Sequence, residues 1–275
     1  MNLSNVHFDP QLPYWQDYLP FLNQLEGPEF PVCDQLNKLL PAGLNSEGGH
    51  AIRFVPSELL DDDGYEHRIY TTGQVSTREQ HWHDLFNAMV WMRFPRIKFA
   101  MNSLHYHAIP EEMDGCRGEL RDALTLFDEC GVIVVSDSLE MLTALAQRCW
   151  TDLFLADTFP NSVRVSICGH AMLEKYLSPY KSMTAKALLV HVGSDFLNLS
   201  RAEMLQCLDN EIAKKLLGGT ILTRPAWLAP LPLAGVPGWW PQNEQNDRSF
   251  YNDLQVFRAP PRHLSPAPVM SLQVN

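Results

Sequence analysis

Residues 81–107 read HWHDLFNAMVWMRFPRIKFAMNSLHYH and contain two hydrophobic helical patterns that meet at Phe94-Pro95. Pro95 suits the first turn of the second helix, because that position needs no backbone N–H donor. The stretch also holds four of the ten histidines of the chain, one carboxylate and two asparagines. Polar groups at this density on helices that build a core indicate a functional site. Apolar residues recur at helical spacing at Trp82, Leu85, Phe86, Met89, Val90, Ile97, Met101 and Leu104.

Outward from this stretch, the second half of the chain alternates between helical and strand patterns. Short β-branched runs predict strands over residues 132–135, 163–167 and 187–192. Amphipathic patterns predict helices over residues 118–127, 139–149, 170–177 and 200–217, the second of them capped by Ser138. The order of elements predicts an α+β (mixed α/β) fold, predominantly helical, whose helices pack on a small mixed sheet. The strand order stays open.

The first quarter has weaker patterns. Helices are predicted over Pro10–Leu25 and Pro31–Leu40, and short strands over Ile52–Val55 and Arg68–Val75. The acidic segment Glu58–Gly64 is predicted to be a loop, with Asp61, Asp62 and Asp63 in a solvated turn. Thr77, followed three residues later by Gln80, matches a capping box at the start of the helix that contains His83.

We expect one domain over residues 1–275, divided into three regions. An acidic, helical N-terminal region spans 1–66 and contains 11 acidic and 2 basic side chains. The core spans 67–219. The arm over 220–275 is rich in proline and tryptophan and is predicted to be irregular, since it lacks periodicity.

Composition excludes several classes of protein. A net charge of −11 argues against a nucleic-acid partner, because such partners are held by clustered Lys and Arg. No apolar run reaches about 18 residues, which argues against a membrane span. The first 30 residues match neither a signal peptide nor a transit peptide. The six cysteines form no Cys-x-x-Cys pair and are typical of reduced thiols. We therefore expect a cytoplasmic protein.

Four sequence blocks together resemble a known family. They are His83-Asp-Leu-Phe-Asn-Ala with Arg93-Phe-Pro-Arg-Ile-Lys and Asn102; Arg121 to Glu129; Gly169-His-Ala-Met-Leu-Glu-Lys; and Pro230-Leu-Pro through Pro237-Gly-Trp-Trp-Pro-Gln-Asn, with Phe250-Tyr-Asn-Asp and Val256-Phe-Arg. The combination resembles the bacterial domain of unknown function 3025 over nearly the whole chain. The resemblance implies a proteobacterial, single-domain protein, and it brings no reaction, cofactor or catalytic residue.

His83, Asp84 and Asn87 form a polar strip on one helix, since they are three and four residues apart. A histidine near a carboxylate can act as a general base, or as a metal ligand with an orienting partner. The structural alternative is that these side chains cap neighbouring loops or bridge helices. The sequence leaves both open.

The pairs His81/His83 and His105/His107 suggest a divalent metal as cofactor. Residues two apart on a helix point about 200° away from each other, so neither pair can chelate from a helix. One histidine from each pair, with Asp84 or a distant Asp, remains as a ligand set. The metal ligands are otherwise unknown.

Arg121, Thr125 and Asp128 can share one face of the helix that leads into the strand at Val132. The end of that helix is a place where side chains often line clefts, and Asp128-Glu129 lies there. Arg121 could act on a substrate, or pair with Asp84 or Asp128 as a structural ion pair.

Cys168-Gly169-His170 joins a strand directly to a helix. The helix N-terminus could bind an anion through Gly169, His170 and the nearby Lys175. A nucleophilic Cys168 with His170 as base is a weaker alternative, because no Gly-x-Cys-x-Gly elbow surrounds the cysteine.

Trp239 and Trp240 in the C-terminal arm are adjacent and cannot both enter one core. One of them therefore lines a pocket, to which Asn243 could add a polar group, or a partner surface; alternatively, the segment attaches the arm to the domain.

These patterns combine into one hypothesis: a hydrolase or group-transfer enzyme for a small anionic substrate. His83 would be the base, Asp84 or Asp128 would orient it, and Arg121 would hold negative charge, with Asn87 beside them. The alternative is a non-catalytic protein-binding module that uses the acidic region and exposed tryptophans. The oligomeric state is open. The residues expected to contact substrate are Asn102, Gly169, His170, Lys175, Trp240 and Asn243.

Overall fold

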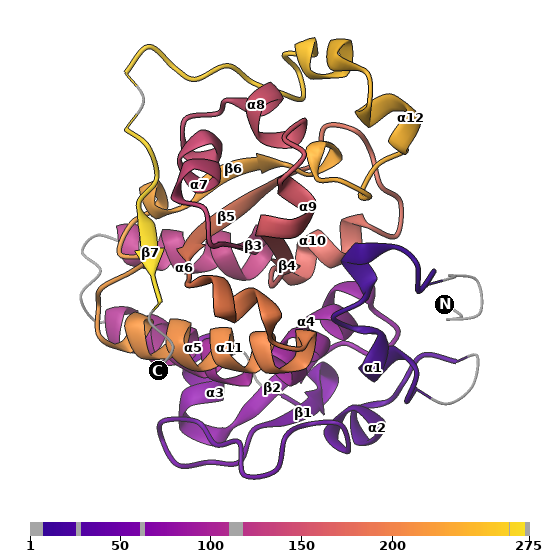
Figure 1. Cartoon of the computed structure of the whole chain (residues 1–275). Coiled ribbons are helices and arrows are strands. Elements are labelled where there is room, and N and C mark those ends of the chain that lie inside the picture. Colours follow the sequence, from indigo (N-terminus) through magenta and orange to yellow (C-terminus); the bar gives the residue numbers. More distant parts are fainter. Residues whose placement is uncertain (1–7, 26–28, 61–63, 110–117, 264, 273–275) are drawn as a thin grey trace.

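The computed structural model describes residues 8–25, 29–60, 64–109, 118–263 and 265–272. Helices surround a five-stranded mixed sheet, and a second, two-stranded sheet lies among the N-terminal elements (Figure 1). This confirms the predicted α+β fold. In the described residues, no helix is both long and apolar enough to cross a membrane.

The five-stranded sheet is built around β3 (Gly131–Ser136) and β5 (Thr184–His191), which pair in parallel. Every residue of β3 is buried, as expected of a central strand that reads as a continuous apolar run. β4 (Val163–Ile167) pairs antiparallel with the other side of β3. The C-terminal arm supplies the last two strands, β6 (Ala229–Pro232) and β7 (Val269–Ser271). β6 is antiparallel to the first half of β5, and β7 is parallel to its second half.

The long helices follow the predicted patterns closely. α4 (Trp82–Arg93) and α5 (Pro95–Ala108) meet at Phe94, and Pro95 begins α5. α5 packs along α11 (Arg201–Leu217), whose buried Asp209 accepts hydrogen bonds from the first backbone N–H groups of α5 (Figure 1). Ser138 caps α7 as expected. The remaining helices of the second half are α6 (Glu119–Cys130), α7 (Leu139–Ala146), α8 (Trp150–Phe154), α9 (Phe159–Ser162), α10 (His170–Lys175) and α12 (Gln242–Gln245).

The predicted strand over Arg68–Val75 is wrong for most of its length. The segment forms α3 (Tyr65–Thr72), and only the residues after Gly73 belong to a strand, β2 (Gln74–Thr77). The hydroxyls of Thr71 and Thr72 donate to the carbonyls of the preceding helical turn, so these β-branched residues are accommodated in the helix. Gly73 ends α3 in the left-handed conformation, where a side chain would be strained.

The other N-terminal predictions hold only in part. Pro10–Leu25 is broken into a 3-10 helix, Pro13–Trp15, and a short α1 (Leu19–Leu22). α2 is limited to Cys33–Asn37, and β1 (Arg53–Pro56) pairs in parallel with β2. The expected turn at residues 61–63 lies outside the described residues.

The capping box at Thr77 is also wrong. Thr77 belongs to β2, its hydroxyl donates to the Val75 carbonyl, and His81 is the N-cap residue of α4. The described residues of the C-terminal arm are largely irregular, as predicted, and they also contribute the short strands β6 and β7. Further 3-10 helices are Ser57–Leu59, Ser194–Asn198, Pro225–Trp227, Leu233–Gly235 and Arg248–Asn252.

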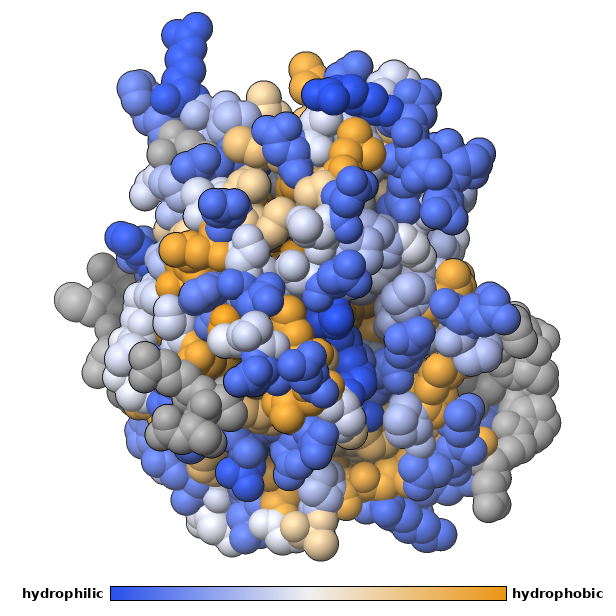
Figure 2. Space-filling model, viewed as in Figure 1, coloured by the Kyte–Doolittle hydropathy of each residue, from blue (hydrophilic) through white to orange (hydrophobic). Residues whose placement is uncertain are grey.

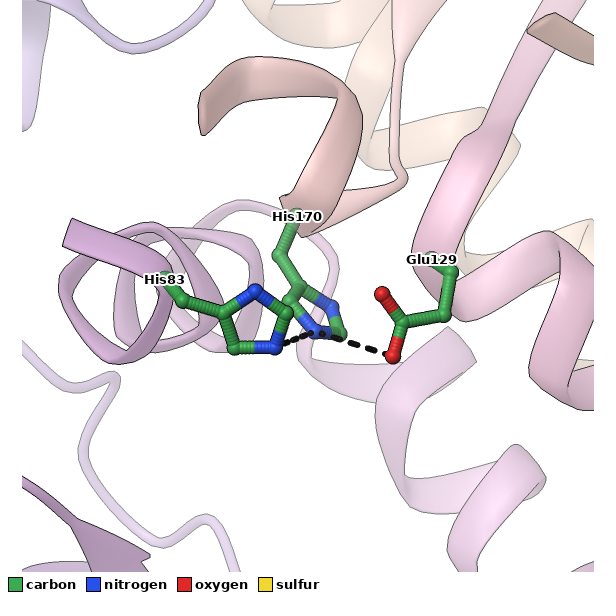
Figure 3. A group of neighbouring side chains, drawn as sticks. All are labelled: His83, Glu129 and His170. Atoms are coloured by element: carbon green, nitrogen blue, oxygen red, sulfur yellow. Dashed lines mark hydrogen bonds and ion pairs between the residues drawn. The ribbon is translucent and has the colours of Figure 1, made fainter. Parts of the chain in front are cut away.

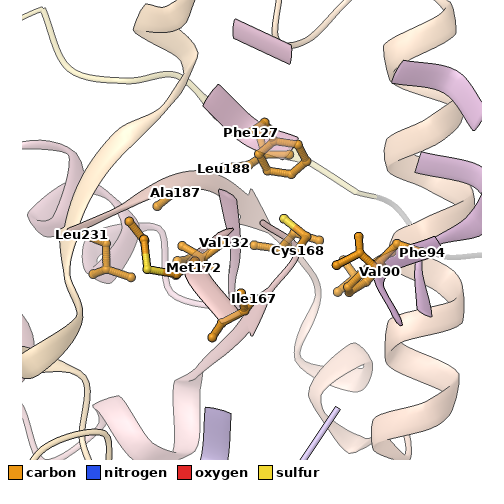
Figure 4. Packing of buried hydrophobic residues seen from close by; sticks show 14 of the residues in the cluster. Val90, Phe94, Phe127, Val132, Ile167, Cys168, Met172, Ala187, Leu188 and Leu231 are labelled. Atoms are coloured by element: carbon orange, nitrogen blue, oxygen red, sulfur yellow. The ribbon is translucent and has the colours of Figure 1, made fainter. Parts of the chain in front are cut away.

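One hydrophobic cluster runs from the sheet into the α4–α5 layer. Strand residues such as Val132 and Ile167 pack beside Met172 of α10, and Phe94 at the α4–α5 junction joins the same cluster (Figure 4). Cys168 is buried within it. The five cysteines of the described residues are free thiols, and Cys116 lies outside them.

The N-terminal segment is attached to this core by buried polar contacts. The Asp17 carboxylate, 4% exposed, accepts two hydrogen bonds of 2.7 Å from Arg201 of α11. Arg201 also donates to the Val165 carbonyl of β4, and the Tyr18 hydroxyl donates to the Ile167 carbonyl. The segment before α2 is therefore fixed to both the sheet and α11.

We predict that Asp17→Ala lowers the free energy of unfolding by about 2 kcal/mol, because Arg201 loses its buried partner. Urea denaturation monitored by tryptophan fluorescence measures the change. Glu211→Ala, which removes the more exposed pair with Lys214, is the matched control and should cost less than about 0.5 kcal/mol. Equal effects of the two variants would contradict the prediction.

Candidate functional site

A pocket of about 860 Å³ opens between the N-terminal elements and the helices around the sheet. It is lined by residues of α3, α4, α5, α6 and the start of α10. All five residues predicted to be catalytic line it: His83, Asp84, Asn87, Arg121 and Asp128. His170 lines it as well.

Two histidines and a glutamate that line this pocket lie close together (Figure 3). His83 Nε2 lies 2.9 Å from His170 Nε2, and His170 Nε2 lies 3.7 Å from Glu129 Oε1. Donor atoms from all three side chains lie within 4.8 Å of one another. Among the described residues this is the group of His, Cys, Asp and Glu side chains close enough to hold a metal ion.

The sheet register explains how Glu129 and His170 come together. β3 and β4 are antiparallel, and Val132 pairs with Ile167. Glu129 lies three residues before Val132, and His170 lies three residues after Ile167. Both residues therefore lie at the same end of the sheet, Glu129 in the last turn of α6 and His170 at the first residue of α10. His83 reaches them from the first turn of α4, which packs against α10.

Each histidine has a carboxylate behind it. His83 Nδ1 lies 3.1 Å from Glu174 Oε2 of α10. The Nδ1 atom of His170 is buried without a hydrogen bond in the described residues, and Asp128 Oδ2 lies 3.8 Å from it. Carboxylates in these places can fix which ring nitrogen carries the proton.

Asp128 is held by a buried lysine. Lys98 of α5, 4% exposed, donates to Asp128 Oδ1 at 2.6 Å and to Asn87 Oδ1 at 2.9 Å. Burial alone would raise the pKa of Asp128, but the charges of Lys98 and His170 outweigh it and lower that pKa below its usual value. Asp128 is therefore a carboxylate at neutral pH.

The partner of the Asp84 carboxylate is Arg78. Its carboxylate accepts three hydrogen bonds from Arg78, one from the backbone N–H and two from the guanidinium. Burial favours a higher pKa for Asp84, but these bonds lower it. The residue that orients His83 is Glu174. Asn87 bridges Lys98 to Tyr65, because its amide nitrogen donates to the Tyr65 hydroxyl at 2.8 Å.

Asn102 acts on the pocket through Glu66 and is not among its described lining residues. Its amide donates to Glu66 Oε2 at 2.6 Å and to the Glu66 carbonyl at 2.9 Å. Burial raises the pKa of Glu66 to about 7, although the Asn102 bond and the charge of Lys98 lower it. Glu66 lines the pocket, so the pocket holds a carboxyl that titrates near neutral pH.

Arg121 donates from its Nε to His105 Nδ1 at 3.4 Å. His107 pairs instead with Glu47 at 3.1 Å. The two histidines of this pair thus have different partners, as helical geometry predicts. His81 faces Asp84 at 3.6 Å, apart from the His83 cluster.

The remaining predicted contacts lie elsewhere. Lys175 is exposed, with its ammonium 3.9 Å from Cys130 Sγ, and does not line the described pocket. Trp240 and Asn243 also fall outside the lining, and Figure 1 shows α12, which carries Asn243, at the end of the molecule opposite β1 and β2. Burial raises the pKa of the Cys168 thiol well above its usual value, which does not suit a nucleophile.

The arrangement of the tryptophans bears on the binding-module alternative. Trp239 is buried and packs edge-on against Tyr14 and Tyr176, while Trp240 is half-buried. The arm is thus attached to the N-terminal segment through Trp239. On the face shown in Figure 2, hydrophobic side chains lie in small groups separated by hydrophilic ones. The two tryptophans do not form an exposed aromatic surface.

Sequence reasoning did not assign a role to several residues of the site. Glu129 was noted beside Asp128 but not as a partner of the histidines, and its place before a buried strand was the available signal. Lys98 stood in the block Arg93-Phe-Pro-Arg-Ile-Lys without a role, although a lysine on an apolar helical face needs a buried partner. No local pattern indicates Glu174, Glu66 or Arg78.

The fold and the pocket define the chain as an α+β protein with a histidine–carboxylate cluster in a pocket beside its sheet. The sequence model of DUF3025, described as a protein of unknown function, matches residues 52–262. The chain therefore belongs to the DUF3025 family, as its sequence blocks indicated. No curated protein and no solved structure matched the chain.

We predict that Gly169→Ala lowers the free energy of unfolding by about 2 kcal/mol, because a Cβ at Gly169 would lie 2.4 Å from Gly131 N and 2.6 Å from Glu129 O. These are backbone atoms that can move only with the strand and helix. Thermal and urea unfolding measure the loss. Gly193→Ala, whose Cβ would meet nothing within 4 Å, is the control and should be near neutral. A neutral Gly169→Ala would contradict the prediction.

We predict that Glu66→Gln stabilises the protein more at pH 8 than at pH 5, by about 2 kcal/mol. A carboxyl whose pKa is raised to about 7 by folding contributes most to stability below its unfolded pKa. That contribution is lost as the pH rises through about 7, and glutamine does not titrate. Urea titrations of both proteins between pH 5 and pH 8 measure the difference between their free energies of unfolding. A difference that stays constant with pH would contradict the prediction.

Proposed function

We propose that the chain is a metal-dependent enzyme that hydrolyses, or transfers a group from, a small anionic substrate in this pocket. The observation that carries the proposal is the approach of His83 Nε2 to His170 Nε2 at 2.9 Å, with Glu129 beside them. Two imidazoles and one carboxylate are a common ligand set of catalytic divalent metals. Such a set leaves coordination positions open for water and substrate.

The carboxylates behind the rings support a cation at this point. If His83 donates its Nδ1 proton to Glu174, and His170 donates toward Asp128, then both Nε2 atoms present lone pairs to each other. Two lone pairs 2.9 Å apart repel unless a cation lies between them. A divalent ion held by His83 and His170 would remove that repulsion, and histidine ligands backed by carboxylates are usual in metal sites.

The charge of the pocket supports the same proposal. Arg78 pairs with Asp84 and Lys98 pairs with Asp128, so the pocket carboxyl groups left to face a metal ion are those of Glu129 and Glu66. A dication would be attracted by the carboxylate of Glu129 beside the two histidines. With the ion in place, the ion and Arg121 would both attract an anionic group of the substrate.

In this proposal the divalent ion supplies Lewis acidity, and the protein supplies proton transfer. Glu66 is the carboxyl suited to that role, since a pKa of about 7 lets it take a proton from the attacking water and give it to the leaving group. His83 would then be a ligand and not the base. Hydrolysis in this form consumes one water and needs no other reactant.

Calorimetric titration of metal-stripped protein with Zn²⁺, Mn²⁺ or, without oxygen, Fe²⁺ tests the metal site. We expect one ion per chain, and about a 100-fold loss of affinity in His83→Ala and in Glu129→Gln, because each removes a ligand. His107→Ala is the matched control, because it removes an exposed histidine of the same pocket that pairs with Glu47. Wild-type protein that binds no ion, or variants that bind as well as wild type, would refute the proposal.

Chromogenic esters and phosphoesters test the reaction class on the metal-loaded protein. Glu66→Gln should keep the metal and lose about 100-fold in kcat, with loss of the pH dependence near 7. Retention of full activity by Glu66→Gln would remove Glu66 from the mechanism.

A further inference from the structure

The residues that line the pocket form two chemically different groups. The polar group, from α4, α6 and α10, includes His83, Glu129 and His170. The second group comes from the start of α3 and the end of α5, and it consists of aromatic, imidazole and aliphatic side chains. These are Tyr65, His67, Tyr106, His107 and Ile109.

The ring of Tyr106 is held by neighbouring aromatic side chains, among them His67 with ring centroids 5.7 Å apart. One face of the Tyr106 ring stacks on Tyr70, with centroids 3.6 Å apart and planes 2° from parallel. His107 meets the ring edge-on at 5.5 Å. Tyr106 lines the pocket and Tyr70 does not, so the pocket reaches the parts of the Tyr106 ring that Tyr70 leaves open. A ring fixed in this way loses little conformational entropy when a ligand packs on it.

Two large apolar side chains of the second group are exposed. Tyr65 is 37% exposed and Ile109 is 39% exposed, and both line the pocket. Their exposure costs hydrophobic free energy that a bound apolar group would recover. A volume of about 860 Å³ also exceeds what a small inorganic anion fills and lies in the range of pockets for drug-sized ligands.

We propose that the substrate of the metal-dependent reaction carries a flat aromatic or heterocyclic ring that packs against Tyr106, while its polar reacting group lies at His83, Glu129 and His170. The inference rests on the proposed function, because the proposed metal site at His83, Glu129 and His170 determines where the reacting group lies. The inference adds the chemical class of the substrate group that does not react.

Hydroxamic acids test the metal site and the ring contact at Tyr106 separately. Their head group chelates divalent metals, and the substituent on it can be varied. The probes are acetohydroxamic, cyclohexanecarbohydroxamic and benzohydroxamic acid, titrated calorimetrically into protein loaded with the metal that binds best. We expect benzohydroxamic acid to bind about tenfold more tightly than acetohydroxamic acid, and more tightly than the non-planar cyclohexyl probe.

Variants at Tyr106 locate the contact. Tyr106→Phe keeps the ring and should keep the tenfold preference, whereas Tyr106→Leu removes the ring and should reduce it to about twofold or less. Both variants should bind acetohydroxamic acid like the wild type. Tyr180→Leu, at an exposed tyrosine that does not line the pocket, is the control. Melting temperatures of all variants show whether each one is folded.

The outcomes separate this inference from the proposed function. Failure of every probe and of the metal to bind overturns the proposed function. Metal binding with equal affinity for all three hydroxamic acids overturns the ring inference alone, and so does a preference that survives in Tyr106→Leu. Equal affinity for the phenyl and cyclohexyl probes, both above acetohydroxamic acid, also overturns it, because an apolar group of any shape would then suffice.

Discussion

The buried ion pair between Lys98 and Asp128 is the interaction on which the pocket depends. Both charges are removed from water, so each is tolerable only while the other is in place. The pair joins α5 to α6, and Asn87 extends it to α4 while Asp128 extends it toward His170. One lysine therefore sets the distance between three helices and keeps the carboxylate behind His170 ionised. The network thus places a carboxylate beside His170.

Sequence periodicity predicted the elements that are long or uniformly buried, such as α4, α5, α11 and β3. It failed where composition and tertiary context disagree. Arg68–Val75 is rich in threonine, tyrosine and isoleucine, yet a glycine at each end and hydroxyls that bond back to the preceding turn favour a helix there. β6 contains two prolines and β7 has only three residues, so neither strand has a periodic sequence pattern. Both strands form because they pair with the edge of β5 that β3 leaves open.

The site was predictable in the same uneven way. His83, Arg121, Asp128 and His170 stood out as polar groups on apolar elements, and they line one pocket. Which of them touch depends on the β3/β4 register and on how α4 crosses α10, and no local pattern contains that information. A slip of one residue between β3 and β4 would shift the start of α10, with His170, relative to the end of α6, with Glu129. The carboxylate that faces His83 comes from 91 residues away, at Glu174.

The shared edge of β5 has a consequence for how the chain can be divided. The family match ends at residue 262, whereas β7 lies at Val269–Ser271 and covers the second half of β5. A protein cut at the end of the match would leave the backbone groups of Leu189 to His191 open along a strand that is apolar at its centre. Open strand edges of this kind recruit other chains, so such a fragment would tend to self-associate. Expression of this fold therefore requires a boundary beyond residue 271.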